Sequence, residues 1–273
     1  MKKHLSTIVL VLVLLCGLAI MLYPVVSDYV STRSHVRQIT SYTAAITQQK
    51  DYSAQWEAAR AFNDTLSGNA NRFYLTKEQR EAYNQALNVS GTGVMGYIKI
   101  PKIDVSLPVY HGTSDAVLQA GVGHIEGTSL PTGDVGTHIA LSGHRGLPSA
   151  TLFTNLDRLG MGDAFTLKIL DQTLTYEVDQ ILVVLPNEMD ALAIDPSQEY
   201  CTLITCTPYG VNSHRLLVRG HRVEVRDRTL QTDAQQVDKL LVAFVVAVPL
   251  LLFMVVWLMT HLCKSRTTKR KER

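Results

Sequence analysis

Two long apolar runs stand near the ends of the chain. The first covers residues 5–26, and the second covers residues 240–262. At 1.5 Å per residue, a helix of either length crosses the ~30 Å hydrocarbon core of a bilayer. The pattern therefore predicts two transmembrane helices. A cleaved signal peptide is the alternative for the first run, although that run is long for one and no clear cleavage site follows it.

Basic residues flank both runs on their outer sides. Lys2 and Lys3 precede the first run within residues 1–4, and residues 263–273 form a basic tail after the second. Positively charged flanks stay in the cytoplasm. We therefore expect a protein of the cell membrane with both termini in the cytoplasm and the chain between the spans outside the cell.

Residues 27–90 follow a helical pattern. Apolar side chains recur every three or four positions from residue 28 to about residue 63, and a polar break follows at residues 66–71. Thr76 and Gln79 then form the two ends of a capping box, which predicts the start of a second short helix. We expect a helical stalk that packs against the next region.

The period changes from about 3.6 to two after Met95, which predicts a mainly β region over residues 91–228 and a juxtamembrane linker over residues 229–239. Short strands separated by Gly, Pro, Asp and Asn are typical of a barrel or a sandwich. Within this region only Ala150–Leu159 predicts a helix. The expected strands cover residues 96–100, 107–111, 138–142, 164–170, 174–185, 200–206 and 215–225.

Charge excludes one class of function. The whole chain carries a formal charge of +2, but the part outside the basic flanks holds 18 basic and 23 acidic residues, a net charge of about −5. A nucleic-acid-binding domain would have a basic surface. We therefore expect no nucleic-acid partner.

Only two of the four cysteines, Cys201 and Cys206, lie between the predicted spans. Along a strand they are about 16 Å apart, beyond the roughly 7 Å limit for a disulfide, and their odd spacing sends them to opposite faces. Cys201 is expected to be a small buried side chain. Cys206 is expected to remain a free thiol.

The segment from Thr202 to Arg222 predicts two strands joined by a loop. The run TLITC is β-branched and apolar, and TPYGVNSH, residues 207–214, is turn chemistry. With that loop, Cys206 and Arg215 face each other across an antiparallel pair, with Cβ atoms about 5 Å apart. A fixed guanidinium charge favours the nucleophilic thiolate.

A cysteine nucleophile needs a base or a cationic partner, and His144 is the leading candidate. It follows an apolar strand and precedes a glycine turn, where a side chain can enter a cleft. A loop histidine bonded to backbone is the alternative. His138 and His144 as metal ligands is a further alternative, but no C-x-x-C or H-E-x-x-H spacing supports it, so we expect no metal and no cofactor.

The segment from Thr202 to Arg222 resembles the sortase signature, and its longer run is similar to class C, the pilin-polymerising sortases. Further stretches resemble the same family, as does the C-terminal span with its basic tail. These stretches are IPKI at 100–103, YHGTS at 110–114, GHIEGTSLP at 123–131 and GHRGLP at 143–148.

The resemblance implies an eight-stranded sortase-type β-barrel with N-terminal helices. It makes Cys206 the nucleophile, His144 the general acid and base, and Arg215 the group that stabilises the oxyanion or orients the substrate. The implied reaction cleaves an LPXTG-like sorting signal between Thr and Gly, forms a thioacyl enzyme, and transfers the acyl group to a lysine amine of a pilin subunit.

Three other functions remain open on the sequence. A membrane-anchored cysteine hydrolase uses the same residues, as does a housekeeping-type sortase that anchors proteins to the cell wall. A non-enzymatic β-barrel adhesin or scaffold would keep Cys206 as a structural thiol.

One stretch departs from the class C pattern. Sortases of this class often carry a lid with an Asp-Pro-aromatic motif over the cysteine, but residues 69–76 read NANRFYLT. Asn71, Arg72 and Phe73 stand roughly where that motif would lie, and Asn71 lacks the charge that an aspartate would offer to Arg215. A lid here would place Phe73 or Tyr74 over the cleft. The alternative is that these aromatic side chains only pack on the barrel.

Overall fold

The computed structural model describes residues 2–224. The second predicted span at 240–262, the linker at 229–239 and the basic tail at 263–273 lie outside the described residues.

The N-terminal helix α1 covers Lys2–Gln48 and contains Pro24. It passes from one compact unit of the chain, which ends at Tyr29 on this side, into a second unit that begins at Val30 and includes the barrel. Among the described residues, the segment Val11–Gln48 of α1 is long and apolar enough to cross a membrane. Such a segment fits a membrane anchor and a signal sequence alike.

Two shorter helices follow, α2 (Ser53–Asp64) and α3 (Lys77–Gln85). The predicted capping box is confirmed, because the Thr76 hydroxyl accepts from the Gln79 backbone while the Gln79 side chain accepts from the Thr76 backbone. One face of α2, with Trp56, Ala59 and Phe62, is buried in the same core as the barrel. The amphipathic pattern of this stretch thus reflects packing against the strands.

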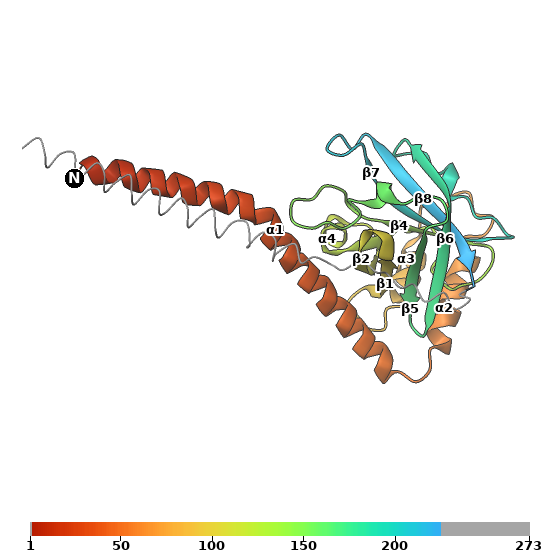
Figure 1. The fold of residues 1–273 in the computed structure, drawn as a ribbon. Coiled ribbons are helices and arrows are strands. Elements are labelled where there is room, and N and C mark those ends of the chain that lie inside the picture. Colours follow the sequence, from red (N-terminus) through yellow and green to blue (C-terminus); the bar gives the residue numbers. More distant parts are fainter. Residues whose placement is uncertain (1, 225–273) are drawn as a thin grey trace, which may run out of the picture. The chain divides into compact units, whose positions relative to one another are not determined.

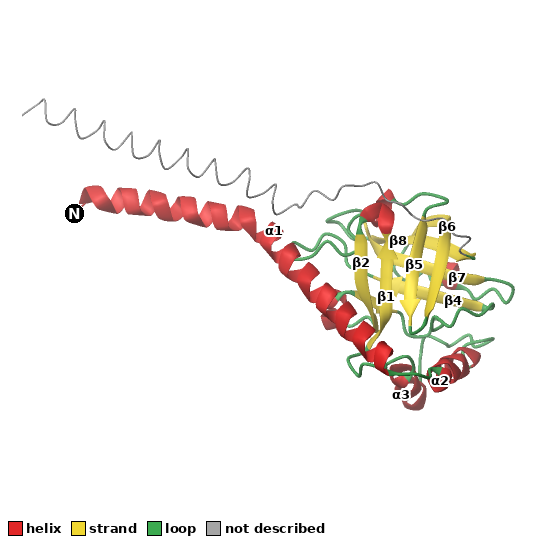
Figure 2. Cartoon of the chain, turned by 60° about the horizontal axis from the view of Figure 1, so that its bottom comes forward, coloured by secondary structure: helices red, strands yellow, loops and turns green. Residues whose placement is uncertain are grey.

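Eight strands close into a barrel in the order β1-β2-β3-β4-β7-β8-β6-β5 (Figures 1 and 2). The predicted mainly β, eight-stranded barrel with N-terminal helices is confirmed. The strands are β1 (Val94–Ile100), β2 (Val105–His111), β3 (Val122–His124), β4 (Thr137–Ser142), β5 (Ala164–Ile169), β6 (Gln172–Val184), β7 (Glu199–Thr207) and β8 (His214–Val223).

Alternation along the strands fills the barrel interior. In β5 every second residue is buried, and Phe165 stacks on Tyr176 of β6 with ring centroids 5.4 Å apart. Leu203 of β7 and Val218 of β8 are register partners and are fully buried. Burial of side chains of this size contributes about 1.5–3 kcal/mol each, so the interior is the main source of the barrel's stability.

Three local elements differ from the sequence-based expectation. Strand β3 has only three residues and helix α4 (Asp115–Ala120) only six, so neither gave a periodic signal. The helix predicted over Ala150–Leu159 is wrong, since this stretch forms turns and a 3-10 segment, η2 (Leu156–Arg158). Leu152 there has a left-handed φ of 39°, which an α-helix excludes.

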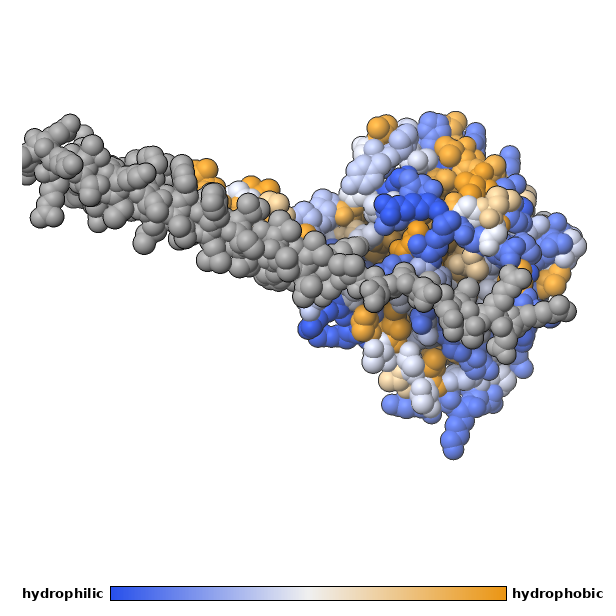
Figure 3. All heavy atoms as spheres, viewed as in Figure 1, coloured by the Kyte–Doolittle hydropathy of each residue, from blue (hydrophilic) through white to orange (hydrophobic). Residues whose placement is uncertain are grey.

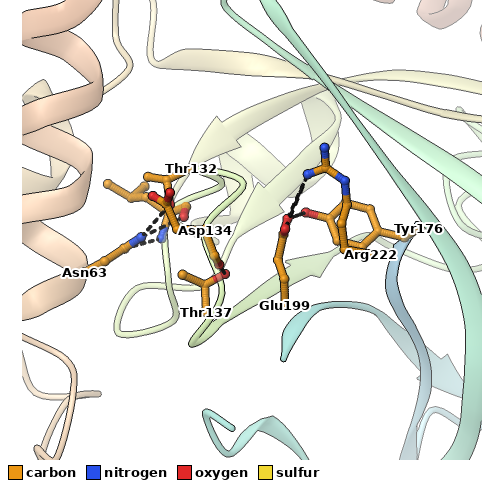
Figure 4. Close-up of polar contacts among 8 residues, drawn as sticks. Asn63, Thr132, Asp134, Thr137, Tyr176, Glu199 and Arg222 are labelled. Carbon is orange, nitrogen blue, oxygen red and sulfur yellow. Dashed lines mark hydrogen bonds and ion pairs between the residues drawn. The ribbon is translucent and has the colours of Figure 1, made fainter. Parts of the chain in front are cut away.

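Polar contacts attach the helical region to the barrel. The Asn63 amide of α2 donates to the Leu130 carbonyl and to the Thr132 hydroxyl, and its oxygen accepts from the Leu130 backbone (Figure 4). From α1, the Tyr42 hydroxyl donates to the Met95 carbonyl of β1. These bonds connect residues far apart in sequence, so they fix how α2 and the end of α1 lie on the strands.

A second polar cluster lies among β6, β7 and β8. The buried Glu199 carboxylate accepts from the Tyr176 hydroxyl at 2.6 Å and from Arg222 at 3.2 Å (Figure 4). A buried carboxylate requires such partners, because an unpaired charge in the interior is costly.

Candidate active site

Strands β7 and β8 place Cys206 and Arg215 directly opposite each other. The two residues are register partners in the antiparallel pair, as the sequence predicted. Both side chains are partly exposed, whereas Cys201 is fully buried on the other face of β7. Burial raises the pKa of the Cys201 thiol well above its usual range. The two thiols of this strand therefore have different environments, and only Cys206 faces solvent.

His144 reaches the same end of the barrel by a different route. Strand β4 runs parallel to β7, with Ser142 opposite Ile204, and the pairing continues one step further because the Gly143 backbone donates to the Ile204 carbonyl at 3.0 Å. The Thr205 hydroxyl also donates to the Gly143 carbonyl at 2.7 Å. Continuing this parallel register brings His144 level with Cys206.

Gly143 and Gly146 flank His144 at positions where a side chain would clash with an aromatic ring. A Cβ atom on Gly143 would lie 2.7 Å from the Phe153 ring, and one on Gly146 would lie 3.0 Å from the Tyr209 ring. Gly146 also has a positive φ of 76°, which favours glycine. Aromatic rings thus pack closely before and after His144, and the Phe153 backbone donates to the His144 carbonyl at 3.1 Å.

The Arg215 guanidinium bonds to the loop between β7 and β8. Its Nη1 donates to the Asn212 carbonyl at 3.3 Å and to the His214 carbonyl at 3.1 Å. Asn212 has a left-handed φ of 59° and donates its backbone N–H to the Pro208 carbonyl, which closes the loop. Arginine carries five N–H donors, so further donors remain for a bound group.

Three other barrel histidines, His111, His124 and His138, have structural roles. His124 and His138 are buried, their ring nitrogens have hydrogen-bond partners, and burial lowers the pKa of each to about 4. Burial also lowers the pKa of His111, whose ring lies within 3.0 Å of two backbone carbonyls. These rings are neutral near pH 7 and their nitrogens are occupied. His144 is thus a better candidate for proton transfer than these three.

An apolar floor extends from Cys206 along the outer face of the strands. Ile204 lies two residues before Cys206, and Leu217 lies two residues after Arg215, so both share the outward face. They pack with Ala140 of β4 and with Leu192, which ends the 3-10 segment η3 (Asp190–Leu192) in the connection from β6 to β7. No local pattern in the sequence indicates this floor, because its members come from four separate segments.

The segment that holds the candidate lid is attached to the barrel through Arg72. Arg72 is only 9% exposed and donates to the Leu192 carbonyl at 2.7 Å and to the Gly127 carbonyl at 3.3 Å. Its guanidinium carbon lies 4.6 Å from the centre of the half-buried Phe73 ring. Asn71 is exposed and Tyr74 is 85% exposed. The polar sequence around Arg72 did not indicate that its side chain is buried.

A cleft of 1070 Å³ lies beside this segment, between α2 and the connection from β6 to β7. Arg60, Arg72, Phe73, Asp134 and Asp190 are among its lining residues. Arg60 and Asp134 form an ion pair at 2.9 Å across the rim. Within residues 2–224, no group of three or more His, Cys, Asp or Glu side chains is placed to hold a metal ion.

The rim near Arg215 presents apolar side chains to solvent. Val184 at the end of β6 is the register partner of Arg215, and the neighbouring Val183 and Leu185 are 60% and 46% exposed. Tyr209 and Val211 in the loop between β7 and β8 are 61% and 69% exposed. Figure 3 shows hydrophobic side chains gathered over the upper end of β6. An exposed apolar rim of this kind suits contact with another protein.

Comparison with known proteins gives one consistent result. The sequence model of the sortase domain family matches residues 98–223 of this chain. Sortase D of Bacillus subtilis (strain 168) is 32% identical over 147 residues, which cover 52% of this chain and 71% of that protein.

Two solved structures are similar over more of the chain. Sortase C1 from Streptococcus agalactiae is 49% identical with a TM-score of 0.66, and the match covers 69% of this chain and 99% of that one. Sortase C of Streptococcus pneumoniae, whose structure bears on pilin substrate specificity, is 41% identical with a TM-score of 0.61, covering 69% and 97%.

Proposed function

Because the chain belongs to the sortase family of cysteine transpeptidases, and to class C within it, we propose that it joins pilin subunits covalently at the cell surface. The substrates in this proposal are a pilin with an LPXTG-like sorting signal and a second pilin with an acceptor lysine. The observation that carries it is a partly exposed thiol directly opposite an arginine at the end of an apolar floor. The parallel register of β4 on β7, continued past Ser142, supports His144 as the third member.

In the first half-reaction the Cys206 thiolate attacks the carbonyl carbon of the threonine. The new S–C bond forms as the C–N bond to glycine breaks, and His144 gives its proton to the leaving amine. Arg215 donates to the oxygen on which negative charge develops. The product is a thioester on Cys206, and the Ile204–Leu217 floor supports the apolar residues of the signal upstream of the threonine.

In the second half-reaction the lysine amine attacks the thioester carbon. The S–C bond breaks, an isopeptide bond forms, and His144 accepts the proton that the amine loses. The membrane anchor supports this step, because holding enzyme and pilins on one surface raises their effective concentration. In this proposal the enzyme has two spans, its catalytic region faces outward and both termini are cytoplasmic.

The test is product analysis with the full-length protein in detergent micelles. Incubation with an LPXTG-like peptide is expected to give a thioester adduct on Cys206, and addition of a lysine-bearing pilin peptide is expected to give a branched product. Release of free acid only, with no branched product at any acceptor concentration, favours the hydrolase. Transfer only to a cell-wall amine favours the housekeeping type, and no adduct at all contradicts a transpeptidase at Cys206.

We also propose that residues 69–76 form a lid that Arg72, rather than an aspartate, holds closed. The guanidinium bonds to the carbonyl of Leu192, which is part of the apolar floor. It also lies over the Phe73 ring, which holds that ring near Leu192. A lid over the floor limits access of a peptide. Asn71 and Tyr74 are exposed and contribute less to this anchoring.

Replacing Arg72 with alanine is expected to increase the rate of peptide cleavage about 10-fold or more. Hydrogen bonds of a charged group contribute about 1.5–3 kcal/mol, and 1.4 kcal/mol is a tenfold change in the closed-to-open ratio. The measurement is the initial rate of peptide cleavage. Lys77→Ala, an exposed neighbour with an 85% exposed side chain, is the control. A rate for Arg72→Ala no higher than that of the control would mean that the segment does not restrict access.

A further inference from the structure

Arg145, the residue after His144, connects three separate segments of the chain. Its Nη2 forms an ion pair with Asp157, in the connection between β4 and β5. Its Nη1 donates to the Thr207 hydroxyl at 3.4 Å, one residue after Cys206. Its guanidinium carbon lies 5.9 Å from the centre of the Tyr209 ring. One side chain thus links the segment that carries His144 to the strand end that carries Cys206.

The environment of Arg145 is unusual for a residue that serves only stability. Its side chain is 10% exposed, and its buried Nε has no hydrogen-bond partner among the described residues. An unpaired buried donor opposes folding, so stability alone does not account for this side chain. The arrangement points to a role in holding the two loops together.

The packing around Arg145 supports this role. The Tyr209 ring lies against Gly146, so it fills the space next to Arg145 on the side of the loop between β7 and β8. The Gly146 backbone in turn donates to the Thr154 hydroxyl at 3.1 Å. The loop with His144 is therefore held to both neighbours of the nucleophile, because Thr205 bonds to Gly143 and Arg145 bonds to Thr207.

We infer that Arg145 is a positioning residue that fixes the distance between His144 and Cys206 by bridging Asp157 and Thr207. This inference rests on the proposed function, in which the two side chains exchange a proton with the substrate. A planar guanidinium reaches both acceptors from one side chain, whereas a lysine ammonium bonds as a single point. Misplacement of reacting groups by about 1 Å is sufficient to lower a rate by about 100-fold.

The test uses full-length protein in detergent micelles and single-turnover formation of the thioester with an LPXTG-like peptide. Arg145→Gln is expected to lower the maximal rate at least 10-fold, while the peptide concentration for half-maximal rate changes less than 3-fold. Arg145→Lys is expected to give no rescue. Arg158→Gln, which removes an exposed arginine from the same connection, is the matched control and is expected to stay within twofold of wild type.

Two further variants keep the test decisive if Arg145→Gln does not fold. Thr207→Val removes one acceptor and is expected to lower the maximal rate about 3- to 10-fold, and Asp157→Asn is expected to have a similar effect. Full rescue by Arg145→Lys, a loss confined to the half-maximal concentration, or wild-type rates in Thr207→Val and Asp157→Asn would overturn the inference.

A second readout separates this inference from the proposed function. Alkylation of Cys206 by iodoacetamide, mapped by mass spectrometry, needs no peptide substrate, and Arg145→Gln is expected to slow it at least 5-fold. If wild-type protein forms no thioester but this difference appears, the proposed function fails and the positioning role stands. If wild-type protein forms the thioester and Arg145→Gln matches it in both assays, only the positioning role fails.

Discussion

Replacing Cys206 with alanine is expected to lower peptide cleavage by about 10⁴-fold or more, which in practice means complete loss. The thiolate is the group that forms the acyl intermediate, and removal of a nucleophile from a catalytic unit reduces turnover by several orders of magnitude. The measurement combines the rate of peptide cleavage with intact-mass detection of the thioester. Both signals are expected to disappear together.

The control for this variant is Cys16→Ala, which removes an exposed cysteine of α1 and leaves the barrel unchanged. It is expected to cleave at the wild-type rate. Cleavage by Cys206→Ala at the rate of Cys16→Ala would rule out the cysteine mechanism and would favour a structural thiol, as in a surface adhesin.

Replacing Arg215 with lysine is expected to lower the maximal rate of thioester formation about 10²- to 10³-fold, in the range seen when one oxyanion donor is lost. Lysine keeps the charge but lacks the planar set of donors. In the structure Arg215 bonds to the Asn212 and His214 carbonyls through Nη1. Its planar guanidinium therefore has other N–H groups with which to bond to the substrate at the same time. A single ammonium is not expected to do both.

Arg219→Lys is the matched control, because Arg219 lies on the same strand and the same face four residues further on, paired with Asp179 at 2.9 Å. Its rate is expected to remain within about threefold of wild type. The readout is single-turnover thioester formation at saturating peptide. A wild-type rate for Arg215→Lys would mean that charge alone is sufficient there and would remove the donor role from the proposed mechanism.

The proposals for Arg72, Arg145 and Arg215 describe three arginines with different tasks around one cysteine. Arg72 bonds to Leu192 at the apolar floor, and Arg145 bonds to Thr207 next to Cys206. Arg215 lies across from Cys206 itself. Each bonds to backbone or side-chain oxygens of loops, so each couples the position of a loop to the chemistry. The effects of the three variants on the rate are expected to be in opposite directions, since loss of Arg72 raises the rate and loss of Arg145 or Arg215 lowers it.

Local sequence determined much of the fold. The capping box at Thr76, the alternation in β5 and the opposition of Cys206 and Arg215 all depend on residues close together in the chain. The length of the loop between two strands fixes which residues face each other. The opposition of Cys206 and Arg215 therefore followed from the number of residues in that loop. The short strand β3 could not be predicted from the sequence, because three residues are too few to show a period. The turns at residues 152–155 could not be predicted either, because they include a bond from the Phe153 backbone to the His144 carbonyl, which no local pattern indicates.

The sequence alone determined the anchor-like first run, the class of fold, and the free thiol opposite an arginine. Tertiary structure alone decided that β4 lies parallel to β7, where the Thr205 hydroxyl bonds to the Gly143 carbonyl 62 positions away, one residue before His144. It also decided that Arg72 is buried and that the Arg145 side chain is only 10% exposed. The reason is that pairing between distant strands and the burial of a charged side chain depend on which surfaces meet after folding, and neither has a local pattern in the chain.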